Sequence, residues 1–329
     1  MSRDSEGRKV PGCGPPVYLG GASEAKWILG YGCPKMGPMS PIFQPAILAP
    51  VPAAARFVTF GFRHASDPGR ALVRLAAWQR DPNVVVGLGE PLLARARGRI
   101  EGMRAFPSDI ALFPRTQEAL WAAFTHTDRG AAFDAGRAFS NMLGDALRVV
   151  EEIDGFVYRG GKDLSGFEDG TENPKGDAAV AAAFVAGRRA GLDGASFVAV
   201  QRWVHDLGAV EAMTQATRES IVGRRLDDNA EIADAPVSAH VKRTAQESFE
   251  PEAFVLRRSM PYGGIAEHGL YFIAYGESLD RFERQLRRMA GRDDGIIDGL
   301  MAFTKAVTGG YYFCPPVLGD KLDLRAVDL

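Results

Sequence analysis

The stretch GFEDGTENP, residues 166–174, lies between two segments in which the predicted strands and helices follow one another in the same order. On each side, β-prone runs and amphipathic stretches alternate as strand, helix, strand, strand, helix, strand. Two βαββαβ units predict an α+β protein with two tandem ferredoxin-like domains and antiparallel sheets. The acidic stretch falls in the linker between the units, and functional residues favour such loops.

The boundaries of the elements follow from turn and cap residues around each hydrophobic run. Gly144, for example, is expected to be the C-cap of a helix. In the first unit we expect strands at 57–62, 83–93, 119–130 and 146–156, and helices at 70–81 and 131–144. In the second unit we expect strands at 195–207, 253–264, 269–276 and 308–316, and helices at 208–223 and 278–291.

The predicted domains are an N-terminal domain at 45–155, a linker at 156–195 and a C-terminal domain at 196–329. Residues 1–44 are rich in Gly, Pro and Ser, and their prolines oppose a sustained helix. We expect this segment to be a flexible N-terminal extension.

Composition narrows the classes of function. The chain of 329 residues carries 39 basic and 41 acidic side chains, so its charge does not predict binding to nucleic acid or to an anionic membrane. Its three cysteines are far apart, odd in number and outside any CxxC spacing, which is typical of a reducing compartment. The sequence contains no apolar run of about 18 residues and no signal-peptide pattern, so we expect a soluble, cytoplasmic protein.

Several explanations of the acidic stretch remain open from its residues alone. Asp-Gly and Asn-Pro are turn-forming pairs, so a plain surface turn is about as good an explanation as a functional one. A calcium loop fits poorly, because Ser165 and Phe167 interrupt the alternating oxygen ligands. A phosphate loop would need a following Lys-Ser or Lys-Thr pair, and the run GLGEPLL at 87–93 lacks the third glycine of a dinucleotide site.

Taken with other motifs, the stretch resembles the signature of the dye-decolorizing peroxidase family, which are haem enzymes with two ferredoxin-like domains and a GxxDG motif. Here the motif runs from Gly166 to Gly170 and continues as TENP; PVSAHVKRT, containing His240, and RRSMPYGG, starting at Arg257, follow it. The resemblance covers nearly all of the chain from about residue 44 onward. The sequence most resembles a compact bacterial subgroup of the family, whose members lack long insertions.

The resemblance implies a role for each matching residue, with haem b bound mainly in the C-terminal domain. His240 is implied as the iron ligand, Asp169 as the distal acid and base, and Arg257 as the distal cation. Ser259 stands where many relatives of the subgroup have Asn, and we include it among the catalytic candidates. Asp298 is the candidate partner of the His240 ring. Further candidates for contact with the cofactor are Gly170, Thr171, Asn173, Arg224, Leu270 and Phe272.

The implied reaction uses hydrogen peroxide to oxidise bulky aromatic donors such as dyes and phenols. A carboxylate can take a proton from one peroxide oxygen and deliver it to the other, while a guanidinium stabilises the charge on the departing oxygen. The subgroup also implies a homo-oligomer. Some members enter encapsulin shells through a C-terminal tail, but the chain ends soon after its last strand, so we do not expect encapsulin loading.

Two other classes of function stay open. One is a haem-binding or iron-handling protein of the same fold with little peroxidase turnover. The other is a tandem ferredoxin-like binding module without haem. His205 and His268 are the alternative iron ligands, and we expect His205 to be structural because it lies at a predicted junction of strand and helix.

Overall fold

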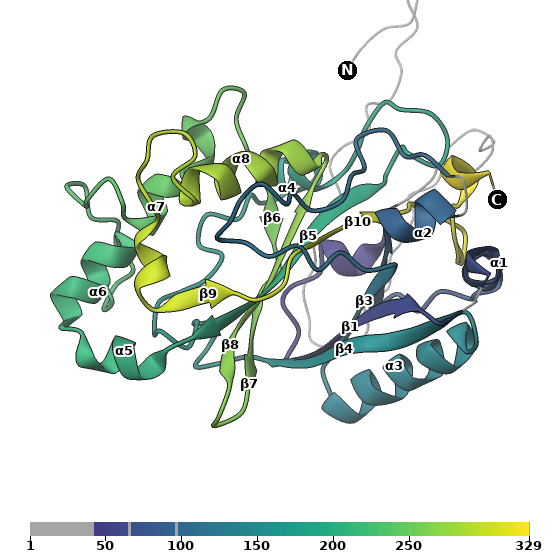
Figure 1. Ribbon diagram of the computed structural model, residues 1–329, viewed down its shortest axis with the longest axis horizontal. Helices are drawn as coiled ribbons and strands as arrows, with labels where there is room; N and C mark the ends of the chain where they lie inside the picture. The colour runs from purple at the N-terminus through teal and green to yellow at the C-terminus, as the bar shows by residue number, and fades with distance from the viewer. Residues whose placement is uncertain (1–42, 65–66, 96–97, 329) are drawn as a thin grey trace, which may run out of the picture. The chain divides into compact units, whose positions relative to one another are not determined.

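A computed structural model describes residues 43–64, 67–95 and 98–328 (Figure 1). The predicted N-terminal extension therefore lies outside the described residues, apart from its last two. Of these, Gln44 is 1% exposed and packs into the fold. Its side-chain amide donates to the carbonyl oxygens of Val86 and Pro315, each at 2.9 Å, and its side-chain oxygen accepts from Val86 N at 2.8 Å.

The first unit has the predicted order of elements with one additional helix, α2. It consists of β1 (Ala54–Phe62), α1 (Pro68–Ala77), β2 (Val84–Gly89), α2 (Glu90–Arg95), β3 (Leu120–His126), α3 (Arg129–Leu143) and β4 (Leu147–Phe156). The strands pair antiparallel in the order β4-β1-β3-β2. Gly144 caps α3 as predicted, with φ of 53°. The strand expected at 83–93 is too long, because Pro91 lacks the N–H that a strand ladder needs but fits the first turn of a helix.

The second unit repeats this order with interruptions. It contains β5 (Ser196–His205), α5 (Leu207–Ala212), α6 (Gln215–Val222), α7 (His240–Arg243), β6 (Leu256–Arg257), β7 (Met260–Gly263), β8 (His268–Gly276), α8 (Leu279–Met289), β9 (Thr304–Ala306) and β10 (Gly310–Cys314). The single helix expected at 208–223 is two helices, because the Thr214 side chain accepts from Thr217 N and starts α6 anew. The strand expected at 253–264 is likewise divided into β6 and β7.

Shorter elements complete the description. They are α4 (Asp177–Ala183), β11 (Val317–Leu318), β12 (Lys321–Leu322), and 3-10 turns at Pro45–Ile47, Gln246–Ser248, Gly299–Ala302 and Arg325–Val327. No helix in residues 43–64, 67–95 and 98–328 is long and apolar enough to cross a bilayer.

The strands of both units join into one sheet, and the pairings between neighbouring strands form a closed ring. β8 pairs with β5 and β7, β7 meets β4 at Tyr262 and Gly155, and β10 pairs with both β5 and β2. The interior of this ring is a core with residues from both units. Phe57 stacks on Tyr271 with ring centres 4.5 Å apart, and Trp121 donates to the Tyr271 hydroxyl at 3.0 Å.

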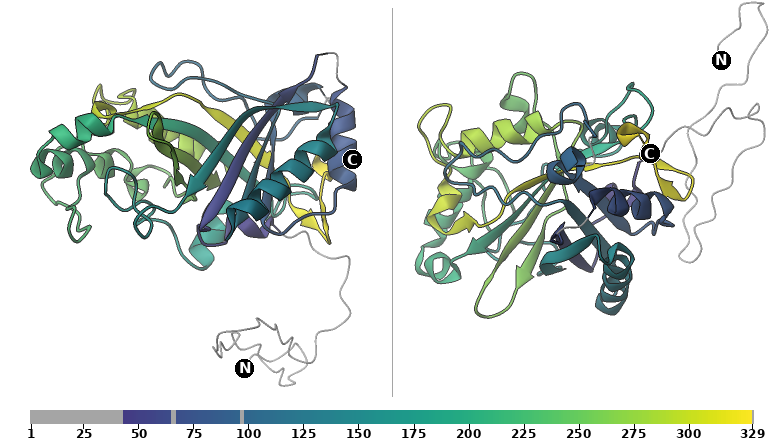
Figure 2. Two further views of the ribbon diagram at one scale, coloured as in Figure 1. Left: turned by 90° about the horizontal axis from the view of Figure 1, so that it is seen from below. Right: turned by 45° about the vertical axis from the view of Figure 1, so that its right-hand side comes forward.

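Helices cover the opposite, outer face of the strands. Along β1, Phe57 belongs to the inner core while Val58 and Phe60 belong to the outer one, as the period of two requires. α1 and α3 lie over the first unit, and α8 lies over β5 and β8 of the second (Figures 1 and 2). Side chains that leave the outer face of β5 and β8 therefore point toward α8 and the loops near it.

Candidate active site

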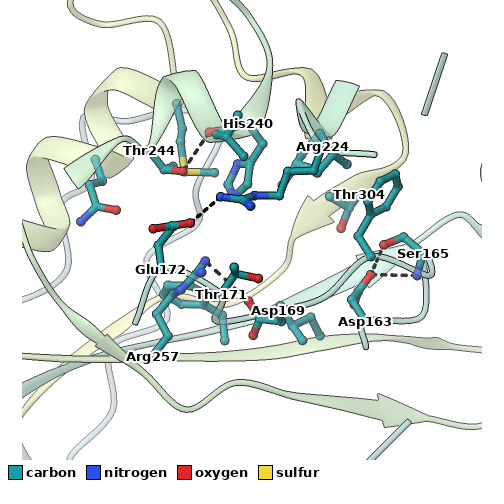
Figure 3. A pocket seen from close by; sticks show the side chains of 18 of the residues that line it. Asp163, Ser165, Asp169, Thr171, Glu172, Arg224, His240, Thr244, Arg257 and Thr304 are labelled. Carbon is teal, nitrogen blue, oxygen red and sulfur yellow. Dashed lines mark hydrogen bonds and ion pairs between the residues drawn. The ribbon is translucent and has the colours of Figure 1, made fainter. Parts of the chain in front are cut away.

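The outer face of β5 and β8 forms one wall of a cavity (Figure 3). Gln201, Trp203 and His205 alternate along β5 on this face, and Leu270 and Phe272 do so along the neighbouring β8. The remaining walls come from α6, α7, α8, the turn before β9 and the acidic stretch around residue 169. The cavity thus collects residues from nearly the whole second unit and from the linker.

The acidic stretch forms a tight turn at the edge of the cavity. Asp163 N donates to Phe167 O at 2.8 Å, and Gly166 N donates to Asp163 O at 2.9 Å. Gly170 has φ of 74°, and a Cβ there would lie 2.8 Å from the side-chain nitrogen of Asn173. Only glycine fits this position without strain. The turn directs the side chain of Asp169, which is 21% exposed, toward the cavity.

Arg257, at the end of β6, approaches Asp169 from the sheet. Its Nη1 lies 3.5 Å from Asp169 Oδ1, and its side chain is 22% exposed. Asn173 fixes the backbone of the arginine, because its side chain accepts from Arg257 N at 2.7 Å and donates to Arg257 O at 3.0 Å. Arg258 turns away, donating to Leu48 O, and burial lowers the pKa of its guanidinium.

His240 lies on the other side of the cavity, at the first residue of α7. Its Nδ1 is 2.8 Å from Oδ2 of Asp298, whose side chain is fully buried. The other oxygen of Asp298 accepts from Leu300 N at 2.9 Å. Because a carboxylate only accepts hydrogen bonds, Nδ1 is the donor to Asp298, and in the neutral ring Nε2 then carries the lone pair. Figure 3 shows the ring directed into the cavity, with Asp169 and Arg257 opposite it.

Arg224 reaches into the space between these two sides. It forms an ion pair with Glu172, and its Nη1 donates to Asn229 O at 2.9 Å. Its side chain is 10% exposed, whereas that of Glu172 is 64% exposed. Figure 3 shows the pair between His240 and Arg257. Nη2 of Arg224 also lies 3.7 Å from Glu231 Oε2, so two carboxylates hold this arginine in place at the cavity.

A second histidine–aspartate pair lines the same cavity. His205 Nε2 lies 3.0 Å from Asp163 Oδ1, and Nδ1 lies 2.6 Å from Thr304 Oγ1. Asp163 Oδ2 accepts from the backbone N–H of Ser165 at 2.8 Å and from its hydroxyl. Burial alone would raise the pKa of Asp163, but the hydrogen bond and charge of His205 and the bonds from Ser165 outweigh it and hold this pKa below its usual value.

The structure brings together most of the predicted site residues. The cavity is lined by Asp169, Thr171, Arg224, His240, Arg257, Leu270 and Phe272. Gly170, Asn173 and Asp298 lie outside the lining and contact residues that belong to it. Ser259 does not line the cavity: its hydroxyl accepts from Ile273 N at 3.3 Å within the sheet. Because β6 and β7 are separate strands, the side chain of Ser259 does not point in the same direction as that of Arg257.

Other lining residues were not predicted as cofactor contacts. Gln201, Trp203 and the α8 side chains Phe282, Leu286 and Met289 form much of the wall. Their spacing of two on β5, and of three to four on α8, is the ordinary pattern of core residues, so the sequence does not distinguish them from a filled core. Asp163 and Glu172 flank the GxxDG motif and could have been found from that position.

Comparisons with known proteins found a family model and several relatives that match this chain. The family model described as "Dyp-type peroxidase, C-terminal" matches residues 161–319. A dye-decolorizing peroxidase of Mycobacterium tuberculosis is 37% identical over 57% of this chain and 57% of its own length. One from Rhodococcus erythropolis is 31% identical over 86% of this chain and 89% of its own length.

Solved structures show the same fold. A Rhodococcus jostii RHA1 DypB variant in complex with heme has a TM-score of 0.73 and 29% identity, over 82% of this chain and 95% of that one. The two ferredoxin-like units, the GxxDG turn and the similarity over 86% of this chain and 89% of the Rhodococcus erythropolis protein lead to one conclusion: the chain belongs to the dye-decolorizing peroxidase family.

Proposed function

We propose that this member of the family is a haem-dependent peroxidase that uses hydrogen peroxide to oxidise organic donors. The observation that carries the proposal is the placement of His240 on one side of the cavity and of Asp169 with Arg257 on the other. A candidate metal ligand and a candidate acid–base pair thus face each other across a cavity that is partly walled by apolar side chains.

The residues present fit a haem group. Neutral imidazole with a hydrogen-bonded second nitrogen is a suitable iron ligand, and His240 has this arrangement through Asp298. Gln201 and Trp203 line the cavity, and within the described residues Gln201 Nε2 and Trp203 Nε1 are buried without a hydrogen-bond partner. Unpartnered buried donors at a cavity are typical of a site for a bound group. Arg224 is suitably placed for a carboxylate of that group.

Haem b is the form that we propose. A c-type haem, which is attached through thioether bonds, would need a CxxCH segment, which the sequence lacks. The one cysteine among the described residues, Cys314, lies in β10 and does not line the cavity. The group would then be held by its ligand, the apolar walls and ion pairs.

Haem, when bound, supplies the iron centre at which the two oxidising equivalents of hydrogen peroxide are received. Asp169 removes a proton from one peroxide oxygen and delivers it to the other, which leaves as water. Arg257 stabilises the negative charge that gathers on this oxygen while the O–O bond breaks heterolytically. Asn173 keeps Arg257 in position, and the apolar side chains of β8 and α8 keep bulk water away.

The remaining predictions belong to the same proposal. We propose aromatic donors as reducing substrates, a homo-oligomer, a cytoplasmic location and no encapsulin loading. The domain boundaries at 45–155, 156–195 and 196–329 also remain predictions, since the strands of both units join in a single sheet.

The absorption spectrum of protein produced with a haem supply tests the proposal. We expect an intense Soret band that changes when peroxide is added and returns when a phenolic donor is added. A Soret band with no response to peroxide would instead indicate a haem-binding or iron-handling protein. Absence of haem binding would instead indicate a haem-free binding module of the same fold.

A further inference from the structure

The stretch from Asp163 to Asn173, which contains the GxxDG motif, is attached to the sheet at both of its ends. The Asn173 side chain bonds to the backbone N–H and carbonyl of Arg257 on β6, at 2.7 and 3.0 Å. At the other end, His205 Nε2 of β5 lies 3.0 Å from Asp163 Oδ1. Because β5 and β6 pair with opposite edges of β8, the stretch crosses over β8. Figure 3 shows Asp169 between the two attachments.

The carboxylate of Asp169 makes no hydrogen bond of its own within residues 43–64, 67–95 and 98–328. Its polar contact there is the ion pair with Arg257, at 3.5 Å. A partly exposed ion pair of this length orients a side chain only weakly. Gly166 and Gly170, with φ of 95° and 74°, add backbone freedom on both sides of it. The position of the carboxylate therefore depends on what holds the backbone of the turn.

Asp163 connects the turn to the sheet. Its Oδ2 accepts from the backbone N–H of Ser165 at 2.8 Å and from the Ser165 hydroxyl. Its backbone N–H donates to Phe167 O at 2.8 Å, and its carbonyl accepts from Gly166 N at 2.9 Å. Oδ1 is the oxygen that bonds to His205. A displacement of Asp163 would therefore move the turn as far as Phe167, two residues before Asp169.

His205 is a fixed point for this attachment. It pairs with Thr304 of β9, and its Nδ1 lies 2.6 Å from Thr304 Oγ1. The ring packs edge-on against Phe303, with ring centres 6.0 Å apart, and the side chain is 5% exposed. Both ring nitrogens thus have partners, and the sheet sets the direction in which Nε2 points.

A third contact holds the turn from the solvent side. The Asn229 side chain donates to Glu168 Oε2 at 3.0 Å and to Thr171 Oγ1 at 2.8 Å. These bonds join exposed side chains and leave the backbone on either side of Asp169 unbonded. The restraint on the backbone comes from the two ends, Asp163 and Asn173.

We infer that His205 and Asp163 form a positioning pair for Asp169. The bond between them holds the GxxDG turn where the Asp169 carboxylate can exchange protons with peroxide. This inference rests on the proposed function. Neither residue of the pair needs to transfer a proton itself. Their contribution is geometric, because misplacing a reacting group by about 1 Å can cost about 10²-fold in rate.

The test compares three variants of the haem-loaded protein. His205→Leu removes the donor to Asp163. His205→Gln keeps a side-chain N–H donor near the position of Nε2. Trp121→Phe is the matched control, because it removes a buried hydrogen bond of 3.0 Å to Tyr271 in the inner core, away from the turn.

Two rates are measured by stopped-flow mixing. The first is the Soret response to peroxide. The second is the Soret change on addition of hydrogen cyanide, which must also give up a proton as it binds ferric haem and which does not depend on turnover. Thermal unfolding is measured on the same samples.

His205→Leu should lower both rates by about 10- to 100-fold, the effect of misplacing an acid–base group. His205→Gln should recover most of this loss, because its amide still donates to Asp163. Trp121→Phe should lower the unfolding temperature and leave both rates unchanged. In protein that carries Asp169→Asn, adding His205→Leu should cause no further loss of rate, because the pair acts through Asp169.

Unchanged rates in His205→Leu would overturn the inference. Equal losses in His205→Leu and His205→Gln, or in Trp121→Phe, would show that packing or overall stability is responsible and would overturn it too. So would a further loss of the same size in the Asp169→Asn protein, since the pair would then act independently of Asp169. A protein that binds cyanide but does not respond to peroxide would contradict the proposed function, while the cyanide rates would still test the pair.

Discussion

Nδ1 of His240 lies 2.8 Å from a carboxylate oxygen of Asp298, whose side chain is completely buried. The two residues are far apart in sequence and come from α7 and the turn before β9. The contact sets the orientation and the tautomer of the imidazole, so Asp298 determines which nitrogen faces the cavity.

Replacing Asp298 with Asn should weaken haem binding by about 10- to 100-fold, the usual effect of removing the hydrogen-bond partner of a metal ligand. The amide can donate as well as accept, so the imidazole is no longer confined to one tautomer. Transfer of haem to an excess of apomyoglobin would measure the change. Asp294→Asn is the control. Asp294 pairs with Arg243, which lies on the same helix as His240, and it does not pair with His240 itself. Equal haem loss in both variants would contradict a specific role for Asp298.

Asn173→Ala should slow the reaction with peroxide without preventing haem binding. The side chain of Asn173 makes two hydrogen bonds to the backbone of Arg257, and it does not line the cavity. Each bond contributes about 1 kcal/mol, and their loss frees the end of β6. Stopped-flow mixing with peroxide and a thermal unfolding curve would be measured together. A loss of stability with an unchanged peroxide rate would show that Asn173 supports only the fold.

The pair of His205 and Asp163 should make stability depend on pH in acid. The pKa of Asp163 in the folded protein is below its usual value of about 3.9. Its contribution to stability is therefore fully present above the usual pKa and is lost as pH falls toward the folded pKa. Asp163→Asn should reduce the free energy of unfolding by about 1–3 kcal/mol at neutral pH, the usual cost of weakening a buried hydrogen bond to His205.

Urea unfolding across the acid range would measure this difference. The difference in free energy of unfolding between the unmodified protein and Asp163→Asn should become smaller below about pH 4. A gap that stays constant from neutral to acid pH would show that the carboxylate charge is not what stabilises the fold. His205→Gln provides the reciprocal variant and should also be less stable than the unmodified protein.

Asp169 and Arg257 should both be needed for peroxide cleavage. Asp169→Asn should slow the reaction by roughly 10²–10⁴, the usual contribution of acid–base catalysis. Had Ser259 lined the cavity, water beside it could have relayed protons when the carboxylate is absent, but Ser259 lies between β6 and β7 with its hydroxyl bonded to Ile273 N of β8. Arg257→Leu should have a comparable effect through lost charge stabilisation. Wild-type rates in both variants would show that neither residue acts on peroxide.

The sequence predicts the order of strands and helices well because a period of two and a period of 3.6 differ strongly over long amphipathic stretches. It fails where one residue changes the backbone, as at Pro91 and Thr214. The GxxDG turn and His240 could be found because their motifs together resemble the signature of the family, whereas the residue types alone left a plain turn equally possible. Gln201 and Phe282 could not, because the same residue types fill ordinary cores and only the packing of α8 over β5 leaves a cavity between them.

The most direct test of the central claim is the haem spectrum of His240→Gly with and without added imidazole. We predict that the variant loses the normal ferric spectrum and that imidazole in solution restores it, because the free ring can take the position that the side chain left. His205→Gly should keep the normal spectrum. An unaltered spectrum in His240→Gly, or loss of the spectrum in His205→Gly alone, would place the ligand on the other histidine and contradict the account of the cavity.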